Sequence, residues 1–206
     1  VKADFPALGE GACKLGSPLI RNLATVGGNL VSARPAADFP PPLMAYGAKL
    51  VLRSGKGERT VALADFIEAP GQTVLAADEI LESILLEKPA SHSGSAYLKL
   101  GLREALEISL VNVAVCITTD GADGPISAAR VVMGSVGPTP LMSASAETTL
   151  LGKNPSEALF LAAGEAAAMD SRPIDDFRAS ADYKRAMVKE LTRRALAQAY
   201  ERAQSE

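Results

Sequence analysis

The stretch "NLATVGGNLVSARPAADFPPPLMA", residues 22–45, differs in kind from the rest of the chain. Two adjacent glycines stand between Thr25 and Asn29, and Asp38 follows inside a proline-rich run. Glycine permits positive φ and lets another group approach the backbone N–H groups closely, whereas proline restricts the backbone on both sides of itself. The stretch therefore forms either a structural turn or a cradle for a polar ligand.

Local chemistry leaves both alternatives open. Gly27 and Gly28 suit a tight turn as well as a phosphate-binding loop. A rigidly held Asp38 accepts hydrogen bonds from the hydroxyl groups of a ribose or ribityl chain, but it serves equally as an N-cap or Asx-turn for residues 43–48. Lys99, at the end of an expected strand, either counters negative charge on a ligand or is a solvated flanking charge.

Composition excludes several classes of protein. The 206 residues are 48% hydrophobic, which is enough for one domain or two small ones. With 21 basic and 24 acidic residues, the net charge of -3 gives no broad basic field for nucleic acid or an anionic membrane. The apolar runs are shorter than the roughly 20 residues that span a bilayer. We therefore expect a cytoplasmic globular protein without a membrane span and without a nucleic-acid partner.

No familiar catalytic or metal-binding pattern is present. Cys13 and Cys116 are far apart and form no CxxC pattern, so this chain alone assembles neither a zinc site nor an iron-sulfur cluster. His92 lies in a small polar segment without a neighbouring acid or nucleophile, which favours an ordinary surface histidine. Hydrolase and P-loop motifs are missing from the sequence. We assign no catalytic and no metal-binding residue.

The order of expected elements is strands first and helices last. A helix over residues 5–16 precedes the glycine pair, and extended segments follow before a small polar break at residues 88–95. Further strands and two helices are expected beyond that break. The expected strands cover residues 43–53, 59–66, 78–87, 95–100, 108–120 and 126–136, and the expected helices cover residues 155–169, with Asn154 as N-cap, and 182–204. This order favours an α+β fold over a doubly wound one.

Four segments taken together carry a resemblance that no single motif carries. Residues 20–66, 78–89, 96–115 and 136–141 resemble the flavoprotein, or medium, subunit of the molybdenum hydroxylases, the family of carbon monoxide dehydrogenase and xanthine dehydrogenase. The resemblance implies that residues 1–90 are the second subdomain of a p-cresol-methylhydroxylase-like FAD-binding fold. Residues 95–206 would then be a C-terminal domain with an antiparallel sheet and a helical bundle.

The resemblance also implies a set of FAD-binding residues. Thr25 to Asn29 would meet the pyrophosphate and ribityl groups, Leu81 would pack on the flavin, and Lys99 would reach the isoalloxazine region. Residues 100–107 would form the loop that governs access by the electron acceptor. The full set is Leu15, Gly16, Thr25, Gly27, Gly28, Asn29, Val31, Ser32, Asp38, Leu81 and Lys99.

The function implied by the resemblance is electron transfer. FAD would receive electrons from [2Fe-2S] clusters on a small partner subunit, which takes them from a molybdopterin site on a large one, and would pass them to NAD or another acceptor. The complex would be a dimer of heterotrimers. A stand-alone flavin oxidoreductase and a non-catalytic interaction module are the alternatives. Relatives begin with another FAD subdomain and a first glycine-rich loop, so we expect weak or no FAD binding by residues 1–206 alone.

Overall fold

The computed structural model describes residues 4–103 and 107–204. The first half contains short helices followed by two small antiparallel sheets, of order β2-β1-β5 and β3-β4. Its elements are α1 (Pro6–Lys14), α2 (Pro18–Arg21), α3 (Val26–Val31), α4 (Pro40–Ala45), β1 (Lys49–Ser54), β2 (Gly57–Ala62), the 3-10 helix η1 (Leu63–Asp65), β3 (Ile67–Ala69), β4 (Gln72–Thr73) and β5 (Ile80–Leu85).

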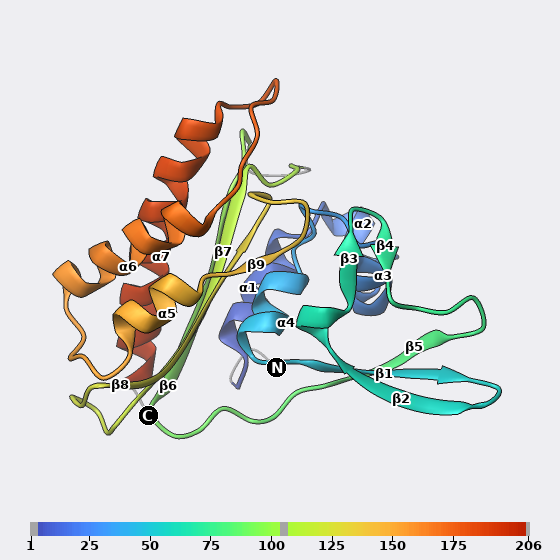
Figure 1. The fold of residues 1–206 in the computed structure, drawn as a ribbon, viewed down its shortest axis with the longest axis horizontal. Coiled ribbons are helices and arrows are strands. Elements are labelled where there is room, and N and C mark those ends of the chain that lie inside the picture. The colour runs from blue at the N-terminus through green and yellow to red at the C-terminus, as the bar shows by residue number, and fades with distance from the viewer. Residues whose placement is uncertain (1–3, 104–106, 205–206) are drawn as a thin grey trace.

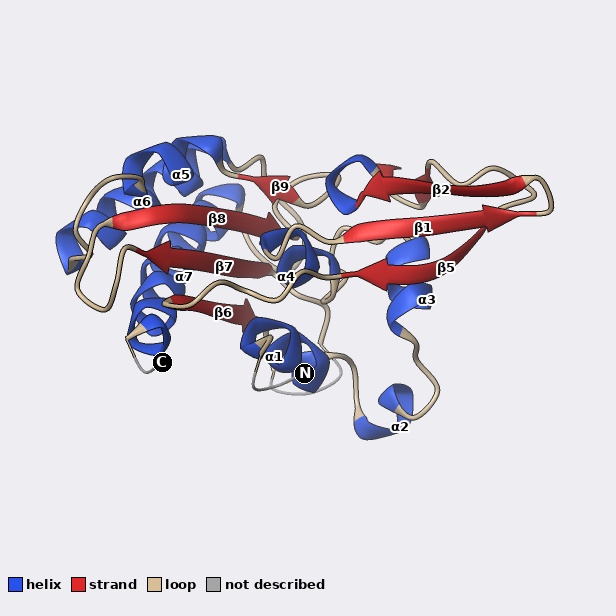
Figure 2. Ribbon diagram, turned by 90° about the horizontal axis from the view of Figure 1, so that it is seen from below, coloured by secondary structure: helices blue, strands red, loops and turns tan. Residues whose placement is uncertain are grey.

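The second half is an antiparallel sheet of order β6-β7-β8-β9 with three helices after it. Its elements are β6 (Ser93–Leu100), β7 (Val111–Thr119), β8 (Ile126–Gly134), β9 (Leu141–Met142), α5 (Ala144–Leu150), α6 (Glu157–Asp170) and α7 (Ala181–Ala203). The two larger sheets of the molecule are β2-β1-β5 and β6-β7-β8-β9. Figures 1 and 2 show them side by side along the long axis, with α5–α7 near one end and the β1–β2 hairpin at the other. The predicted α+β class is confirmed.

The β6–β9 sheet is covered on both faces. Val113 and Val115 of β7 point into a core formed with α5, α6 and α7, whereas Ala114 between them belongs to a second core with α1 and α4. This alternation follows from the period of two along a strand. The second core also contains Leu50 of β1, so one hydrophobic cluster joins the N-terminal helices and both larger sheets.

Several expected boundaries are confirmed and others are wrong. The helix over residues 5–16 is α1, and Gly16 follows it with φ of +47°, as a glycine beyond a helix C-terminus does. Residues 43–45 belong to α4 and not to a strand, because Pro40 starts a helix at a position that tolerates proline. The expected cap Asn154 is also wrong, since α6 is capped by Ser156. The sequence interpretation missed α5.

The other expected strands and the last expected helix agree better with the structure. Residues 49–53, 95–100, 108–120 and 126–136 overlap β1, β6, β7 and β8, and the helix over residues 182–204 is α7. In the described ranges, no helix is both long and apolar enough to cross a bilayer.

Candidate functional site

An open groove of about 850 Å³ lies beside α3 and is here called the α3 groove. It is built from residues 15–38 together with two distant segments, one at Glu107 and Ile108 and one at Arg178. Its lining residues are Leu15, Gly16, Ile20, Leu23, Ala24, Thr25, Gly28, Asn29, Ser32, Arg34, Pro35, Ala36, Ala37, Asp38, Glu107, Ile108 and Arg178.

The glycine pair forms the first turn of α3. Thr25 is the N-cap, and its Oγ1 accepts a hydrogen bond from the Gly28 N–H at 2.9 Å. Neither Gly27 nor Gly28 has a positive φ, so neither uses the left-handed backbone that glycine permits. Gly28 provides space for the cap, because a Cβ there would lie 2.9 Å from Thr25 Oγ1, whereas a Cβ on Gly27 would meet Leu81 at an ordinary contact distance of 3.7 Å.

Asn29 brings a side-chain donor of α3 to the groove. The first N–H groups of a helix favour an anion when they are free, but the Gly28 N–H is bonded to Thr25 Oγ1, and Val26 and Gly27 do not line the groove. Asn29 Oδ1 accepts from the Phe39 N–H at 3.2 Å, and this bond ties α3 to the start of α4. The Asn29 side chain is an amide, so its nitrogen remains a donor. Ser32 Oγ donates to the Asn29 carbonyl oxygen at 2.8 Å.

Asp38 is held by a buried polar network. Tyr97 Oη donates to its carboxylate at 2.7 Å, and Lys99 Nζ lies 2.9 and 3.0 Å from the two carboxylate oxygens. Asp38 is only 5% exposed. Burial raises the pKa of Asp38, while the hydrogen bonds and charge of Lys99 and the hydroxyl of Tyr97 oppose that rise. The network fixes a carboxylate acceptor at the wall of the groove.

This geometry rejects two sequence-based alternatives. Asp38 does not cap the segment after it, because the N-cap of α4 is Phe39 and no side chain caps that helix. Lys99 is not a solvated flanking charge: its side chain is 7% exposed, and Nζ also donates to the Lys14 carbonyl oxygen at 3.2 Å.

Most of the predicted binding residues meet in the α3 groove. Those that line it are Leu15, Gly16, Thr25, Gly28, Asn29, Ser32 and Asp38. Gly27 and Leu81 pack against each other, Val31 is a partly exposed residue of α3, and Lys99 reaches the groove only through Asp38. Residues 104–106 of the predicted access loop lie outside the described residues.

Sequence reasoning missed several residues of this site, among them Tyr97 and Arg178. Tyr97 shares a face of β6 with Lys99 because the two are separated by one residue, so the period of two along a strand was the available signal. Arg178 follows α6 and has no local motif that points to the groove. Exposed Ile20 and Leu23 add apolar surface from the α2 region.

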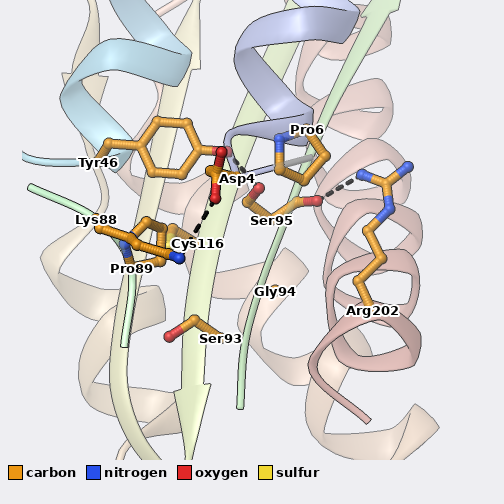
Figure 3. A pocket seen from close by; sticks show the side chains of 10 residues that line it. All are labelled: Asp4, Pro6, Tyr46, Lys88, Pro89, Ser93, Gly94, Ser95, Cys116 and Arg202. Carbon is orange, nitrogen blue, oxygen red and sulfur yellow. Dashed lines mark hydrogen bonds and ion pairs between the residues drawn. The ribbon is translucent and has the colours of Figure 1, made fainter. Parts of the chain in front are cut away.

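A second cavity, of about 270 Å³, lies near the N-terminus of α1 and is drawn in Figure 3. Its polar groups pair with one another: the hydroxyls of Tyr46 and Ser95 are 2.5 Å apart, and Arg202 donates to the Ser95 carbonyl oxygen. Cys116 contributes a thiol whose pKa burial raises to about 11. A thiol that stays protonated at neutral pH is a poor nucleophile. This cavity is the weaker candidate.

His92 lies outside both cavities, at the start of β6. It is half-buried rather than an ordinary surface residue, and it has a positive φ of 56°. Its Nδ1 atom is buried and has no hydrogen-bond partner within the described ranges.

Two known families match most of this chain. Residues 1–89 match the family described as the FAD binding domain in molybdopterin dehydrogenase, and residues 96–199 match the CO dehydrogenase flavoprotein C-terminal domain. The chain belongs to the FAD-binding medium subunits of the molybdenum hydroxylases. These medium subunits are components of oxidoreductases.

Two relatives show how similar this chain is to individual subunits of the family. It is 33% identical over 202 residues to the carbon monoxide dehydrogenase medium chain of Hydrogenophaga pseudoflava, covering 98% of this chain and 69% of the relative. It is 32% identical over 196 residues to the xanthine dehydrogenase FAD-binding subunit of Escherichia coli O157:H7, covering 95% of this chain and 66% of the relative. The chain thus spans about two thirds of the length of these relatives.

Solved structures show the same fold. Carbon monoxide dehydrogenase from Hydrogenophaga pseudoflava, in a form that lacks the Mo-pyranopterin moiety of its molybdenum cofactor, matches 98% of this medium subunit and 69% of its own chain. The TM-score is 0.92 and the identity 33%. Quinoline 2-oxidoreductase from Pseudomonas putida 86 matches with a TM-score of 0.90 at 26% identity, over 99% of this chain and 70% of its own.

Proposed function

We propose that the α3 groove binds FAD and that this chain carries the flavin of a molybdenum hydroxylase. The observation that carries the proposal is the convergence, in one groove, of the Asn29 amide at the start of α3 and the fixed acceptor Asp38. A dinucleotide needs both, because its pyrophosphate accepts hydrogen bonds and its hydroxyl groups donate them. When bound, FAD supplies the reversible uptake of electrons that the side chains of this chain do not provide.

The residues present fit such a ligand. The amide nitrogen of Asn29 suits a phosphate oxygen. Asp38 accepts from ribityl or ribose hydroxyls, and Tyr97 and Lys99 hold its carboxylate in place. Apolar walls at Leu15, Ile20 and Leu23 are available to exclude water.

The role expected for Lys99 changes with this geometry. Its charge is paired with Asp38, so it acts on the groove as a buried positioning cation rather than as a free contact. We propose that the sequence-based FAD contacts at Gly27, Val31 and Leu81 act by shaping the groove wall around α3. Leu81 does so by packing on Gly27.

The partners and the electron path remain proposals. We propose that electrons arrive from [2Fe-2S] clusters on a small subunit, which receives them from a large molybdopterin subunit, and leave to NAD or another acceptor. The medium-chain names of the relatives support a multi-subunit complex, for which we propose a dimer of heterotrimers in the cytoplasm. The two matched regions support a division into residues 1–90 and 95–206.

An Asn29→Asp substitution tests FAD binding without removing the bond that Asn29 makes to Phe39. The carboxylate still accepts from the Phe39 N–H, but a donor is lost and a negative charge faces the ligand. We expect the dissociation constant for FAD to rise about tenfold or more, which corresponds to about 1.4 kcal/mol, and the flavin content of the purified complex to fall with it. Iron and molybdenum, measured in the same sample, should be unchanged.

Asn154→Asp is the matched control, because Asn154 is exposed and lies outside the groove. It adds the same charge and should leave flavin content at the wild-type value. Equal flavin content in both variants and the wild type would reject the groove as the FAD site and favour the interaction-module alternative. A complex with flavin but no iron or molybdenum would favour the stand-alone oxidoreductase.

A further inference from the structure

A separate cavity of about 380 Å³ adjoins the α3 groove, here called the proline cavity because four proline rings line it. It lies between the loop that follows β8 at residues 135–138 and the segment at residues 172–178 that joins α6 to α7. The α6–α7 connection is the orange-red segment that extends beyond the helix ends in Figure 1. Pro35 and Arg178 line both the proline cavity and the α3 groove.

Ser135 is the unusual residue of the proline cavity. Its φ is +66°, a left-handed conformation that non-glycine residues adopt at a cost. The bond from its N–H to the Pro35 carbonyl oxygen, 2.9 Å long, holds this conformation. Its Oγ is buried and finds no hydrogen-bond partner in the part of the chain that the structure describes. A strained residue with an unused buried hydroxyl is typical of a binding site.

The charges that line the proline cavity are unbalanced. Lys184 is 2% exposed, and its Nζ lies 2.9 Å from Asp176 Oδ2 and 2.8 Å from the Ile174 carbonyl oxygen. Arg178 donates to the same Asp176 oxygen at 2.6 Å. One carboxylate is thus shared by two cations, one of them buried.

Arg172 adds a third cation to the lining of the cavity. Burial opposes ionisation of Asp170, which lies outside the cavity, but hydrogen bonds from Ser143 and Ser145, together with the charge of Arg172, lower its pKa. Arg172 is exposed, and within the described ranges its side chain makes no hydrogen bond and no ion pair, so its N–H groups are available to a ligand. The lining therefore holds three cations and a single carboxylate.

We propose that the proline cavity binds a small oxyanion, a carboxylate or phosphate group, between the Ser135 hydroxyl and the guanidinium groups of Arg172 and Arg178. An oxyanion accepts the unused Ser135 hydrogen and balances the excess positive charge. Guanidinium groups recognise both classes of anion. The proline rings supply rigid walls without N–H donors, so recognition depends on these three side chains. This inference does not depend on what binds in the α3 groove.

Calorimetric titration of residues 1–206 with inorganic phosphate and, separately, with acetate tests the proposal. We expect saturable binding of at least one probe, and the stronger of the two identifies the anion class. Sodium chloride at the same ionic strength should produce no saturable signal, because screening is not site binding.

Two variants and one control locate the site. Ser135→Gly removes the hydroxyl but accepts the left-handed backbone, so it should weaken binding about tenfold or more while raising the melting temperature of the free protein. Arg172→Gln should weaken binding similarly. Arg185→Gln removes the same charge from an exposed position on α7 outside the cavity and should leave binding unchanged.

The absence of saturable binding for both probes would overturn the proposal. Equal loss of binding in all three variants would also overturn it, because that result would indicate a general charge effect. Wild-type binding in both Ser135→Gly and Arg172→Gln would overturn it as well.

Discussion

Replacing Lys99 with methionine should lower the free energy of unfolding, because the buried Asp38 carboxylate then loses its charged partner. The substitution keeps the volume of the side chain but removes the cation that lies 2.9 and 3.0 Å from the two carboxylate oxygens. Asp38 and Lys99 have side chains that are each 7% exposed, so water cannot replace the lost partner fully. Breaking a buried ion pair by removing one member costs about 3 to 5 kcal/mol. For a chain of this size, that cost lowers the melting temperature by roughly 6 to 20 °C.

The stability that Lys99→Met loses should be larger at neutral pH than in acid. Burial already raises the folded-state pKa of Asp38 above its ordinary value of 3.8, and Lys99 is the main opposing influence. Without Lys99 the folded-state pKa rises further, so the folded state binds the proton more tightly than the unfolded state. Stability therefore falls as pH rises from 3.8 through the folded-state pKa, and the defect of Lys99→Met should be smaller in acid than at neutral pH.

Urea unfolding of the wild type, both single variants and the double variant at several pH values measures this coupling. Asp38→Asn combined with Lys99→Met should be more stable than Lys99→Met alone, because the carbonyl oxygen of the introduced amide still accepts from Tyr97 and no charge stays buried. If Lys99→Met loses less than about 1 kcal/mol, or if the double variant is no more stable than Lys99→Met, the pair does not control the stability of this wall.

Glycine substitutions test two other close contacts. Gly94→Ala would place a Cβ 1.8 Å from the Ala199 carbonyl oxygen of α7, so we expect a loss of about 3 kcal/mol or more in urea unfolding; a normal midpoint would show that α7 can shift. Gly28→Ala should lose about 1 kcal/mol, because its Cβ would lie 2.9 Å from the capping hydroxyl of Thr25. Gly27→Ala meets only an ordinary contact and should be neutral or slightly stabilising, since alanine favours a helix more than glycine. Equal losses in the two variants would argue against the cap as the cause.

The strands of the second sheet were predictable because their pattern is local. Val113, Val115 and Ile117 alternate with other residues along β7, and this period of two is visible in the sequence alone. The position of Gly16 after α1 was predictable for the same reason, since a helix pattern ends there. Such elements can be predicted from the sequence because their form is determined by their own residues.

α3 was not predictable as a helix from local propensity. It has six residues, and two of them are glycines, which are poor helix formers. Its helical form is held by the Thr25 cap and by the bond from the Phe39 N–H to Asn29, a residue ten positions earlier. Tertiary contacts therefore override propensity at the one element that defines the groove.

The groove belongs to the whole chain rather than to the first matched region. Asp38 lies in residues 1–89, but both of its donors, Tyr97 and Lys99, lie on β6 in the second matched region. The Tyr97 N–H in turn donates to Glu10 of α1, and Arg202 of α7 donates to the same carboxylate group. Because buried carboxylates require their donors, a chain divided at residues 88–95 would lose the arrangement that holds Asp38. The chemistry of the α3 groove is therefore set by packing between the two matched regions, and substitutions on β6 should alter the groove through Asp38.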